Sequence, residues 1–306
     1  MTYNTAAYAG GDCGPGKLAP NIADIQGSGL TTLMLWALHI GRPSISGQHY
    51  GDFIFNDGAN LFISQGAFNP LGTAAIAAWP GQIARLKQQG SVKKVYFSIG
   101  GASPPVFDFT TVQYMLNNGM ADVLSDNVAA LKQAFTVSGS CAIDGFDLDC
   151  EENVDQSTIV ALSQIFFEQG FEVSFCPYTN QDFWQGCMQT LWDKGLKVSR
   201  WNLQCYSGGA GNDVASWISG IAAVVGQQAA PSYMVPGLAV VGQQDAQCPT
   251  GQDSICSSFA GWSSLGLPGG FLWLYDSILD HPGGCNGTAT LKNYVAAINN
   301  GLADNC

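Results

Sequence analysis

The sequence predicts an α/β fold, a closed (β/α)8 TIM barrel that residues 1–306 form as a single domain. Short β-branched or aromatic runs alternate with longer helical patterns, which is typical of repeated βα units and a parallel sheet. The length of 306 residues and the 46% hydrophobic content suit one barrel of about 250 residues with its loops. An acidic motif at the end of one strand lies where such barrels carry their chemistry.

Eight strands are expected, each followed by a helix or a loop. In chain order they are Ala6–Ala9, Thr31–His39, Lys94–Ser98, Ile143–Asp149, Glu172–Pro177, Arg200–Tyr206, Val235–Val240 and Gly270–Tyr275. Apolar residues at helical spacing predict helices over Ala74–Gln89, Val123–Phe135 and Gln156–Gln169.

Two departures from the simple βα repeat can be examined in the sequence. Apolar runs at 53–55 and 61–63 flank Asn56-Asp57-Gly58, which predicts a hairpin in the loop after the second strand. Between the seventh and eighth strands there are only about thirty residues, which leaves no room for an extra α+β subdomain.

Charge and composition exclude several classes of partner. A net charge of −12 with only 11 basic residues argues against nucleic acid and against an anionic membrane. No run of eighteen apolar residues predicts a membrane span. A surface with few charges suits a neutral polysaccharide, and a monomer is expected. The first residues lack the basic start and apolar segment of a signal peptide, so we expect a removed leader or another route of export.

The 10 cysteines favour an oxidising destination, so a secreted, extracellular protein is expected. Closeness in sequence makes Cys248/Cys256, Cys285/Cys306 and Cys176/Cys187 the candidate disulfides. Cys150 and Cys205 alternate with inward-facing residues, so both are expected to point outward against helices as buried free thiols. No C-x-x-C is present and the three histidines lack metal spacing, so neither a metal nor a cofactor is expected.

The most informative segment is the acidic run from Asp144 to Glu151. A strand places Asp147, Asp149 and Glu151 in one row, because alternate side chains point the same way. Like charges this close cannot all ionise, so one carboxyl stays protonated as a proton donor and its ionised neighbours stabilise a cation. That combination suits acid-catalysed acetal cleavage. The alternatives, an exposed acidic strand or a calcium loop, conflict with the apolar flanks and with the spacing. Asp144 lies off the row and is expected to hold backbone.

The run D-G-F-D-L-D-C-E fits the D-x-x-D-x-D-x-E signature of glycoside hydrolase family 18, which contains the chitinases and some endo-β-N-acetylglucosaminidases. Three further segments resemble that family. Residues 95–101 resemble its S-x-G-G strand, 204–206 resemble the Q-x-Y strand end of the short plant class III type enzymes, and 270–273 resemble its last barrel strand. The resemblance spans most of the chain.

The resemblance implies a catalytic role for four residues. Glu151 protonates the glycosidic oxygen while the 2-acetamido carbonyl of the substrate attacks C1, and an oxazolinium ion results. Asp149 orients the acetamido group, Asp147 shares a proton with Asp149, and Tyr206 donates a hydrogen bond to the acetamido oxygen.

Four more residues are expected to bind substrate. By the resemblance, Gln204 contacts the acetamido group and Trp273 lies under the sugar ring. Trp36 and Tyr178 are candidates for the sugar groove, as is Trp184, although core or rim packing is an equal interpretation for these three. Ser98 and Gly100–Gly101 are expected to shape the barrel, and Glu152 could shift the acidity of Glu151 if it is not turned to solvent.

Three functions remain open at this point. The first is a chitinase-type endo-hydrolase of β-1,4-linked N-acetylglucosamine polymers. The second is an endo-β-N-acetylglucosaminidase that cuts N-glycan cores. The third is a non-catalytic carbohydrate-binding barrel, since a fold does not prove an activity. The short seventh connection predicts an open groove and endo-acting, non-processive cleavage.

Overall fold

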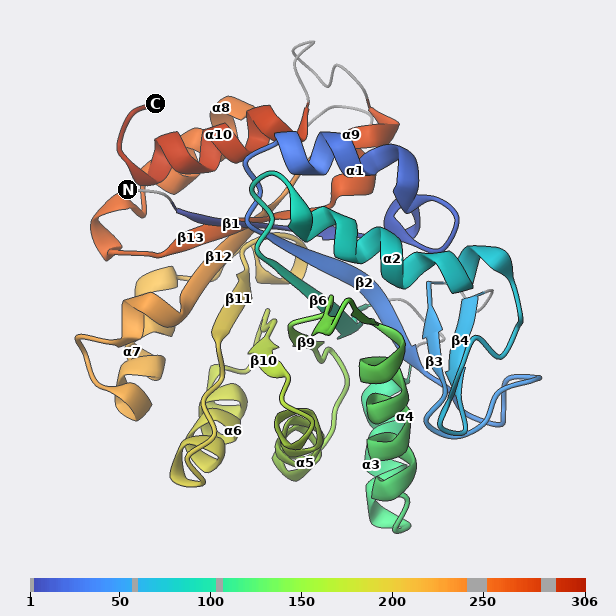
Figure 1. Ribbon diagram of the computed structural model, residues 1–306. Coiled ribbons are helices and arrows are strands. Elements are labelled where there is room, and N and C mark those ends of the chain that lie inside the picture. The colour runs from blue at the N-terminus through green and yellow to red at the C-terminus, as the bar shows by residue number, and fades with distance from the viewer. Residues whose placement is uncertain (1–2, 57–59, 103–106, 241–251, 282–289) are drawn as a thin grey trace.

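The computed structural model describes residues 3–56, 60–102, 107–240, 252–281 and 290–306. They form one closed parallel barrel with helices around it (Figure 1). The barrel strands are β1 (Asn4–Ala9), β2 (Thr32–Ile40), β6 (Lys94–Gly100), β9 (Gly145–Asp149), β10 (Glu172–Phe175), β11 (Arg200–Gln204), β12 (Met234–Ala239) and β13 (Gly269–Trp273). Each pairs in parallel with its neighbours, and β1 closes the ring by pairing with both β2 and β13. The predicted (β/α)8 barrel is confirmed.

Helices cover the outside of the barrel in the order that right-handed crossovers require. They are α1 (Leu18–Gly27), α2 (Ala74–Gln88), α3 (Asp108–Asn117), α4 (Ala121–Ala134), α5 (Gln156–Glu168), α6 (Gln181–Asp193), α7 (Val214–Val225), α8 (Gln252–Ala260), α9 (Tyr275–Asp280) and α10 (Leu291–Leu302). The three predicted helices are confirmed as α2, α4 and α5. In α2 the Thr73 hydroxyl accepts a hydrogen bond from the Ile76 amide, so a side-chain cap fixes the start of the helix.

The predicted hairpin is also present. Strands β3 (Phe53–Phe55) and β4 (Asn60–Ser64) pair antiparallel, and β3 pairs with the end of β2 through Leu38 and Phe55. The short strand β5 (Ala67–Phe68) adds to β4, while residues 57–59 of the turn lie outside the described residues. Figure 1 shows β3 and β4 beside the barrel, next to α2 and α4. A second small hairpin, β7 (Thr136–Val137) with β8 (Ser140–Cys141), precedes β9.

Two apolar clusters fill the protein. The larger lies between strands and helices, and the smaller lies inside the barrel. The interior cluster contains Ala6, Tyr8, Met34, Tyr96, Cys176, Tyr206, Val235, Phe271 and Leu274. The barrel interior is therefore filled with side chains. Those nearest the carboxyl ends of the strands form the floor of any site at that end of the barrel.

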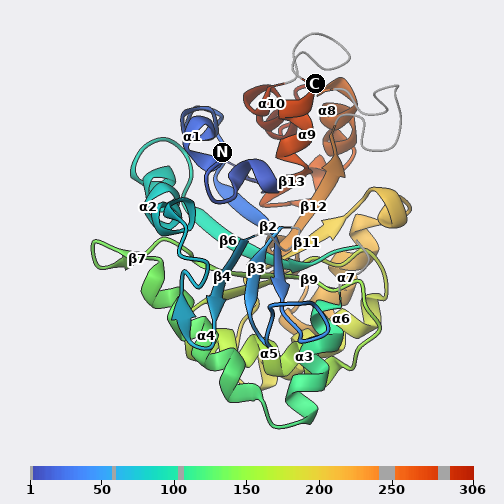
Figure 2. The same cartoon turned by 90° about the vertical axis from the view of Figure 1, so that its right-hand side faces the viewer.

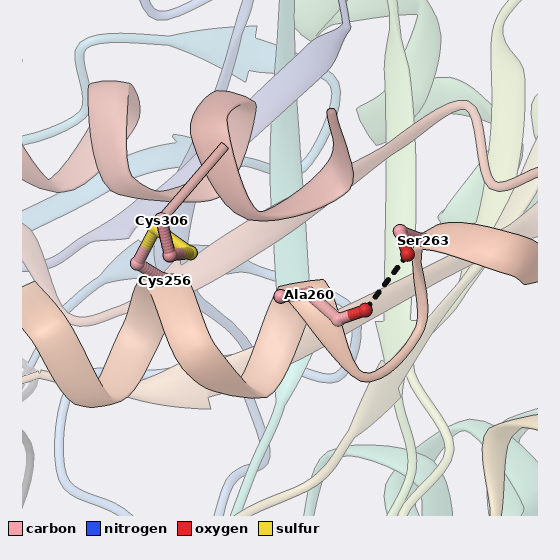
Figure 3. Close-up of a disulfide and its surroundings, with 4 residues drawn as sticks. All are labelled: Cys256, Ala260, Ser263 and Cys306. Carbon is pink, nitrogen blue, oxygen red and sulfur yellow. Dashed lines mark hydrogen bonds between the residues drawn. A yellow bond between two sulfur atoms is a disulfide. The ribbon is translucent and has the colours of Figure 1, made fainter. Parts of the chain in front are cut away.

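The disulfide within the described residues joins Cys256 of α8 to Cys306 (Figure 3). The expected pairs Cys248/Cys256 and Cys285/Cys306 are therefore wrong, and positions 248 and 285 themselves lie outside the described residues. The reason is spatial, because α10 packs against α8 and so carries the last residues of the chain to Cys256 (Figure 2).

The other thiols divide between the two sides of the barrel wall. The expected Cys176/Cys187 bond is wrong, because both thiols are free: Cys176 belongs to the interior cluster and Cys187 to the outer one. Cys150 and Cys205 are buried free thiols of the outer cluster, as predicted. Burial raises the pKa of Cys205 to about 12, which keeps this thiol protonated and unreactive.

None of the described helices combines the length and apolar character that a bilayer crossing requires.

Candidate active site

Strand β9 places its acidic row at the centre of the barrel. Asp147 is completely buried and Asp149 is 2% exposed, whereas Glu151 lies just beyond the strand end and is half-buried. The neighbouring strands are in register with this row, since Ser98 and Ser174 flank Asp147 and Gly100 flanks Asp149. The row therefore runs from the interior cluster to the carboxyl-end face of the barrel.

Asp147 accepts four hydrogen bonds. The hydroxyls of Tyr8 and Ser98 donate to Oδ2 at 2.7 and 2.8 Å. The Ser174 hydroxyl and the Asn202 side-chain amide donate to Oδ1 at 2.6 and 2.9 Å. Burial raises the pKa of Asp147, and these donors oppose that rise. An ionised carboxylate has four such acceptor sites, so this environment suits a fixed negative charge.

Asp149 and Glu151 titrate together above Asp147. Burial raises the pKa of Asp149 well above its usual range, and the negative charges of Glu151 and Asp147 raise it further. Burial also raises the pKa of Glu151, against a hydrogen bond from Gln204. The Gln204 amide donates to Asp149 Oδ1 at 2.8 Å. Two coupled carboxyls with raised pKa values are suited to retaining one proton between them.

Three aromatic side chains form the floor and wall beside this pair. Tyr206 is 9% exposed and stacks on Trp273, with ring centroids 5.9 Å apart and planes at 18°. Trp36 meets Trp273 edge-on at 4.7 Å, and its indole N–H donates to the Gly100 carbonyl at 3.0 Å. Burial raises the pKa of the Tyr206 phenol well above its usual range, so Tyr206 stays a neutral hydrogen-bond donor.

A cavity of about 240 Å³ opens over this arrangement. It is lined by seven of the eight predicted site residues, together with Gly101, Ala102, Ser207 and Gly208; the seven are Trp36, Asp149, Glu151, Tyr178, Gln204, Tyr206 and Trp273. The eighth, Asp147, lies beneath the floor. The seven residues come from strands β2, β9, β11 and β13, from the residues that directly follow β9 and β11, and from the loop after β10.

The Gly100-Gly101 pair leaves space that side chains would fill. Both have positive φ, 95° and 113°. A Cβ on Gly100 would overlap the Asp149 carbonyl oxygen, and one on Gly101 would lie 3.0 Å from the Trp36 indole nitrogen. Glycine here lets β6 approach β9 and lets Trp36 border the cavity. Ser98, in contrast, acts directly on the acidic row through Asp147.

Two further acids, Asp144 at the start of the motif and Glu152 directly after it, do not line the main cavity. Asp144 Oδ2 accepts hydrogen bonds from the Val95 amide and from Lys87 Nζ, both at 2.8 Å, which confirms its predicted backbone role. Glu152 accepts hydrogen bonds from the amides of Phe109 and Thr110 at 2.9 and 2.8 Å, so it occupies the N-terminus of α3. A helix N-terminus stabilises a carboxylate, which holds Glu152 away from Glu151.

Tyr178 and Trp184 differ in their surroundings. Tyr178 is half-buried and borders both the main cavity and a second, smaller one of about 70 Å³. Trp184 is 2% exposed and packs on Phe175 with ring centroids 5.0 Å apart, so core packing accounts for it although it also borders the smaller cavity. Glu151 borders both cavities as well.

Sequence reasoning missed three residues that bind Asp147: Tyr8, Ser174 and Asn202. Each is a fully buried polar side chain within a barrel strand. A polar residue at an inward-facing position of a buried strand is the signal that could have found them, because a buried polar group needs a partner. Within the described ranges, no group of three or more His, Cys, Asp and Glu side chains is placed to hold a metal ion.

Comparison with known proteins gives structural matches alone. No protein-family model and no curated protein sequence matches the chain. The catalytic domain of a family GH18 chitinase from the fern Peteris ryukyuensis superposes with a TM-score of 0.58 at 17% identity, over 97% of this chain and 98% of that one. The catalytic domain of a hyperthermophilic chitinase from Pyrococcus furiosus gives 0.64 at 13% identity, over 99% and 96%.

A third match is catalytic domain 2 of the Group II chitinase from Ostrinia furnacalis, solved in complex with penta-N-acetylchitooctaose. It gives a TM-score of 0.60 at 13% identity, over 99% of this chain and 97% of that one. The three matches cover nearly the whole length of each chain. The chain therefore has the (β/α)8 fold of the GH18 chitinase catalytic domains.

Proposed function

We propose that this chain is a retaining endo-hydrolase of β-1,4-linked N-acetylglucosamine polymers, a chitinase that uses its substrate as the nucleophile. One observation carries the proposal. The two carboxyls among the described lining residues of the cavity, Asp149 and Glu151, come from the same strand end. A retaining enzyme with a protein nucleophile needs a second carboxylate about 5 Å across the scissile bond from its acid. The other large side chains among the described lining residues are Gln204 and four aromatic residues, Trp36, Tyr178, Tyr206 and Trp273.

In the proposed reaction, Glu151 donates the proton of the carboxyl pair to the glycosidic oxygen. The substrate's acetamido oxygen attacks C1, the C1–O bond breaks, and a cyclic oxazolinium ion forms. Asp149, now ionised, offsets the positive charge, and the Tyr206 hydroxyl donates to the acetamido oxygen. Water activated by Glu151 then opens the ring, so the product keeps the β configuration. Trp273 supplies an apolar surface under the sugar.

We assign the mobile proton to Asp149 and Glu151 rather than to Asp147 and Asp149. The support is that the acceptor sites of Asp147 are occupied by Tyr8, Ser98, Ser174 and Asn202. Asp147 then acts through its fixed negative charge, which raises the pKa of Asp149.

The polymer and the mode of attack are further parts of the proposal. Penta-N-acetylchitooctaose in the Ostrinia furnacalis complex supports N-acetylglucosamine chains as the ligand. The connection from β12 to β13, residues 240–268, is short, which supports an open groove that a chain enters sideways and leaves after one cut. We also propose a monomer that acts outside the cell, where the Cys256–Cys306 disulfide would persist.

The test is a pair of neighbouring isosteric changes. Glu151→Gln should lower kcat by several orders of magnitude and leave oligosaccharide binding nearly intact, because leaving-group protonation belongs to the transition state. Glu152→Gln is the matched control, because its side chain caps α3 and should keep wild-type turnover. Wild-type turnover in Glu151→Gln would refute the site.

Product identity separates the candidate substrates. The protein is incubated with chitin oligomers and with a high-mannose glycopeptide, and the products are identified by mass. Cleavage of the glycopeptide alone would replace chitinase with an endo-β-N-acetylglucosaminidase, and binding without cleavage of either would indicate a carbohydrate-binding barrel. Proton NMR of fresh chitin digests should show the β-anomer first, and initial α-anomer would exclude the acetamido-assisted route.

A further inference from the structure

A cluster of exposed apolar side chains lies outside the cavity, around α3. Among the described residues, the strongly exposed large hydrophobic side chains are Ile45, Leu71, Phe107, Tyr114 and Val123. All except Leu71 belong to the loop 41–52 or to the segment that begins at Phe107 and continues through α3 into α4. Single exposed apolar residues are ordinary, but a cluster of them marks a binding surface.

Two aromatic platforms organise this surface. Tyr50 of the loop stacks on Tyr114 of α3, with ring centroids 5.0 Å apart and planes at 23°. The Arg42 guanidinium lies 4.3 Å from the centre of the Phe107 ring. We call these four residues, Arg42, Tyr50, Phe107 and Tyr114, the exposed aromatic face.

Buried polar contacts hold the loop that carries half of this face. The Asn127 side-chain amide donates to the Gly51 carbonyl at 2.6 Å, and Asp52 Oδ2 accepts from the His49 amide at 2.7 Å. Asn127 and Asp52 are both fully buried. The Gly41 amide also donates to the Asp52 carbonyl at 2.7 Å. Tyr50 is therefore positioned before any ligand arrives, so binding orders little additional chain.

The spacing of the two platforms indicates the kind of ligand. Phe107 directly precedes α3 and Tyr114 lies seven residues later, so their Cα atoms are separated by about two helical turns, or about 10 Å along the axis. That distance is close to the length of two β-1,4-linked pyranose units. In such a chain every second ring presents the same apolar face of axial C–H groups, so rings two apart can stack on the two platforms.

The charge of the face fits the same ligand. Arg42 is the charged member and its guanidinium is already on Phe107, where its N–H groups can donate to sugar hydroxyls. The net charge of −12 opposes stacking of nucleic-acid bases on these rings. The face also lies at the cavity end of the barrel, because the end of β2 is tied to the start of α3 through the Ile40 amide, which donates to Asp108 Oδ1 at 2.6 Å.

We propose that the exposed aromatic face is an auxiliary binding site for β-1,4-linked pyranose chains. It would hold an insoluble polysaccharide beside the cavity while soluble oligomers reach the cavity without it. The choice of N-acetylglucosamine as the sugar unit rests on the proposed function. The stacking geometry is independent of that function.

The test compares Phe107→Ala, Tyr114→Ala and their double variant with Leu71→Ala, an equally exposed apolar residue outside the face. Adsorption to insoluble chitin should weaken roughly tenfold in the double variant and remain unchanged in Leu71→Ala. Hydrolysis of a soluble chitin oligomer should stay at the wild-type rate in all four proteins. Melting temperatures confirm that each variant folds.

The outcomes separate this site from the proposed function. Wild-type adsorption by the double variant, in a protein that cleaves soluble oligomers, would overturn the auxiliary site and leave the chitinase intact. Adsorption that depends on Phe107 and Tyr114 in a protein that cleaves nothing would keep the site and reject the enzyme. A wild-type dimer that Tyr114→Ala dissociates in sedimentation would show that the face binds a second copy instead, and would also overturn the proposal.

Discussion

Replacing Asp147 should reveal how much of the fold depends on its four hydrogen bonds. Asp147→Ala leaves the donors of Tyr8, Ser98, Ser174 and Asn202 without their acceptor, and all four residues are fully buried. An orphaned buried donor costs at least about 1 kcal/mol, so the loss should be about 4 kcal/mol. Against a typical total of about 5–15 kcal/mol, that change is large.

Two milder variants should lose less stability than Asp147→Ala. Asp147→Asn can accept from Ser174 and Asn202 through its oxygen and donate through its nitrogen to the hydroxyl oxygens of Tyr8 and Ser98, so it should lose only about 1–2 kcal/mol. Ser174→Ala removes one donor and should lose about 1 kcal/mol. Urea unfolding followed by tryptophan fluorescence measures all three. Equal stability of Asp147→Ala and wild type, or equal loss in Asp147→Ala and Asp147→Asn, would refute the four-donor account.

The Asp149–Glu151 carboxyl pair, the Tyr206 phenol and Gly100 each give a further test. Activity on a soluble oligomer should fall as the pH rises through the raised pKa that Asp149 and Glu151 share, because the pair then loses the proton for the leaving group. In Asp147→Asn this alkaline fall should begin at lower pH, since loss of a neighbouring negative charge lowers the pKa of Asp149; an unmoved limb would contradict the electrostatic link. Tyr206→Phe should lower kcat by roughly 10²-fold with KM little changed, as expected for one lost oxyanion donor, and steady-state kinetics would decide. Gly100→Ala should lower the melting temperature, because its Cβ would overlap the Asp149 carbonyl oxygen at a φ of 95°, and an unchanged calorimetric transition would count against that steric conflict.

The local pattern of apolar residues was enough to predict the barrel, because strands and helices repeat their apolar residues with different periods. The strand ends were less accurate: β13 ends at Trp273 where the sequence predicted Tyr275, since Tyr275 already begins α9. Similarly, β11 ends at Gln204, two residues before Tyr206. Apolar residues continue past both strand ends, so hydrophobicity alone cannot locate where pairing stops.

Sequence motifs were enough to predict that the acidic row, Gln204 and Tyr206 belong to one candidate site. Single polar residues such as Tyr8, Ser174 and Asn202 have no such motif. The register of β10 with β9 places Ser174 beside Asp147, whereas Tyr8 of β1 and Asn202 of β11 reach Asp147 only across the interior of the closed barrel. The predicted disulfide pairings were wrong for a related reason. Sequence separation describes the loop that a bond would close, whereas the packing of α8 against α10 decides which sulfurs meet.

Closure of the barrel by its first and last strands has a consequence for synthesis. Strand β1 pairs with β2 on one side, but its other partner, β13, begins only at Gly269. A nascent chain therefore carries an open, apolar strand edge until almost the whole sequence has left the ribosome. Nonsense products that stop before β13 would expose unpaired edges on both β1 and β12. Such fragments should self-associate through these edges rather than persist as smaller soluble domains.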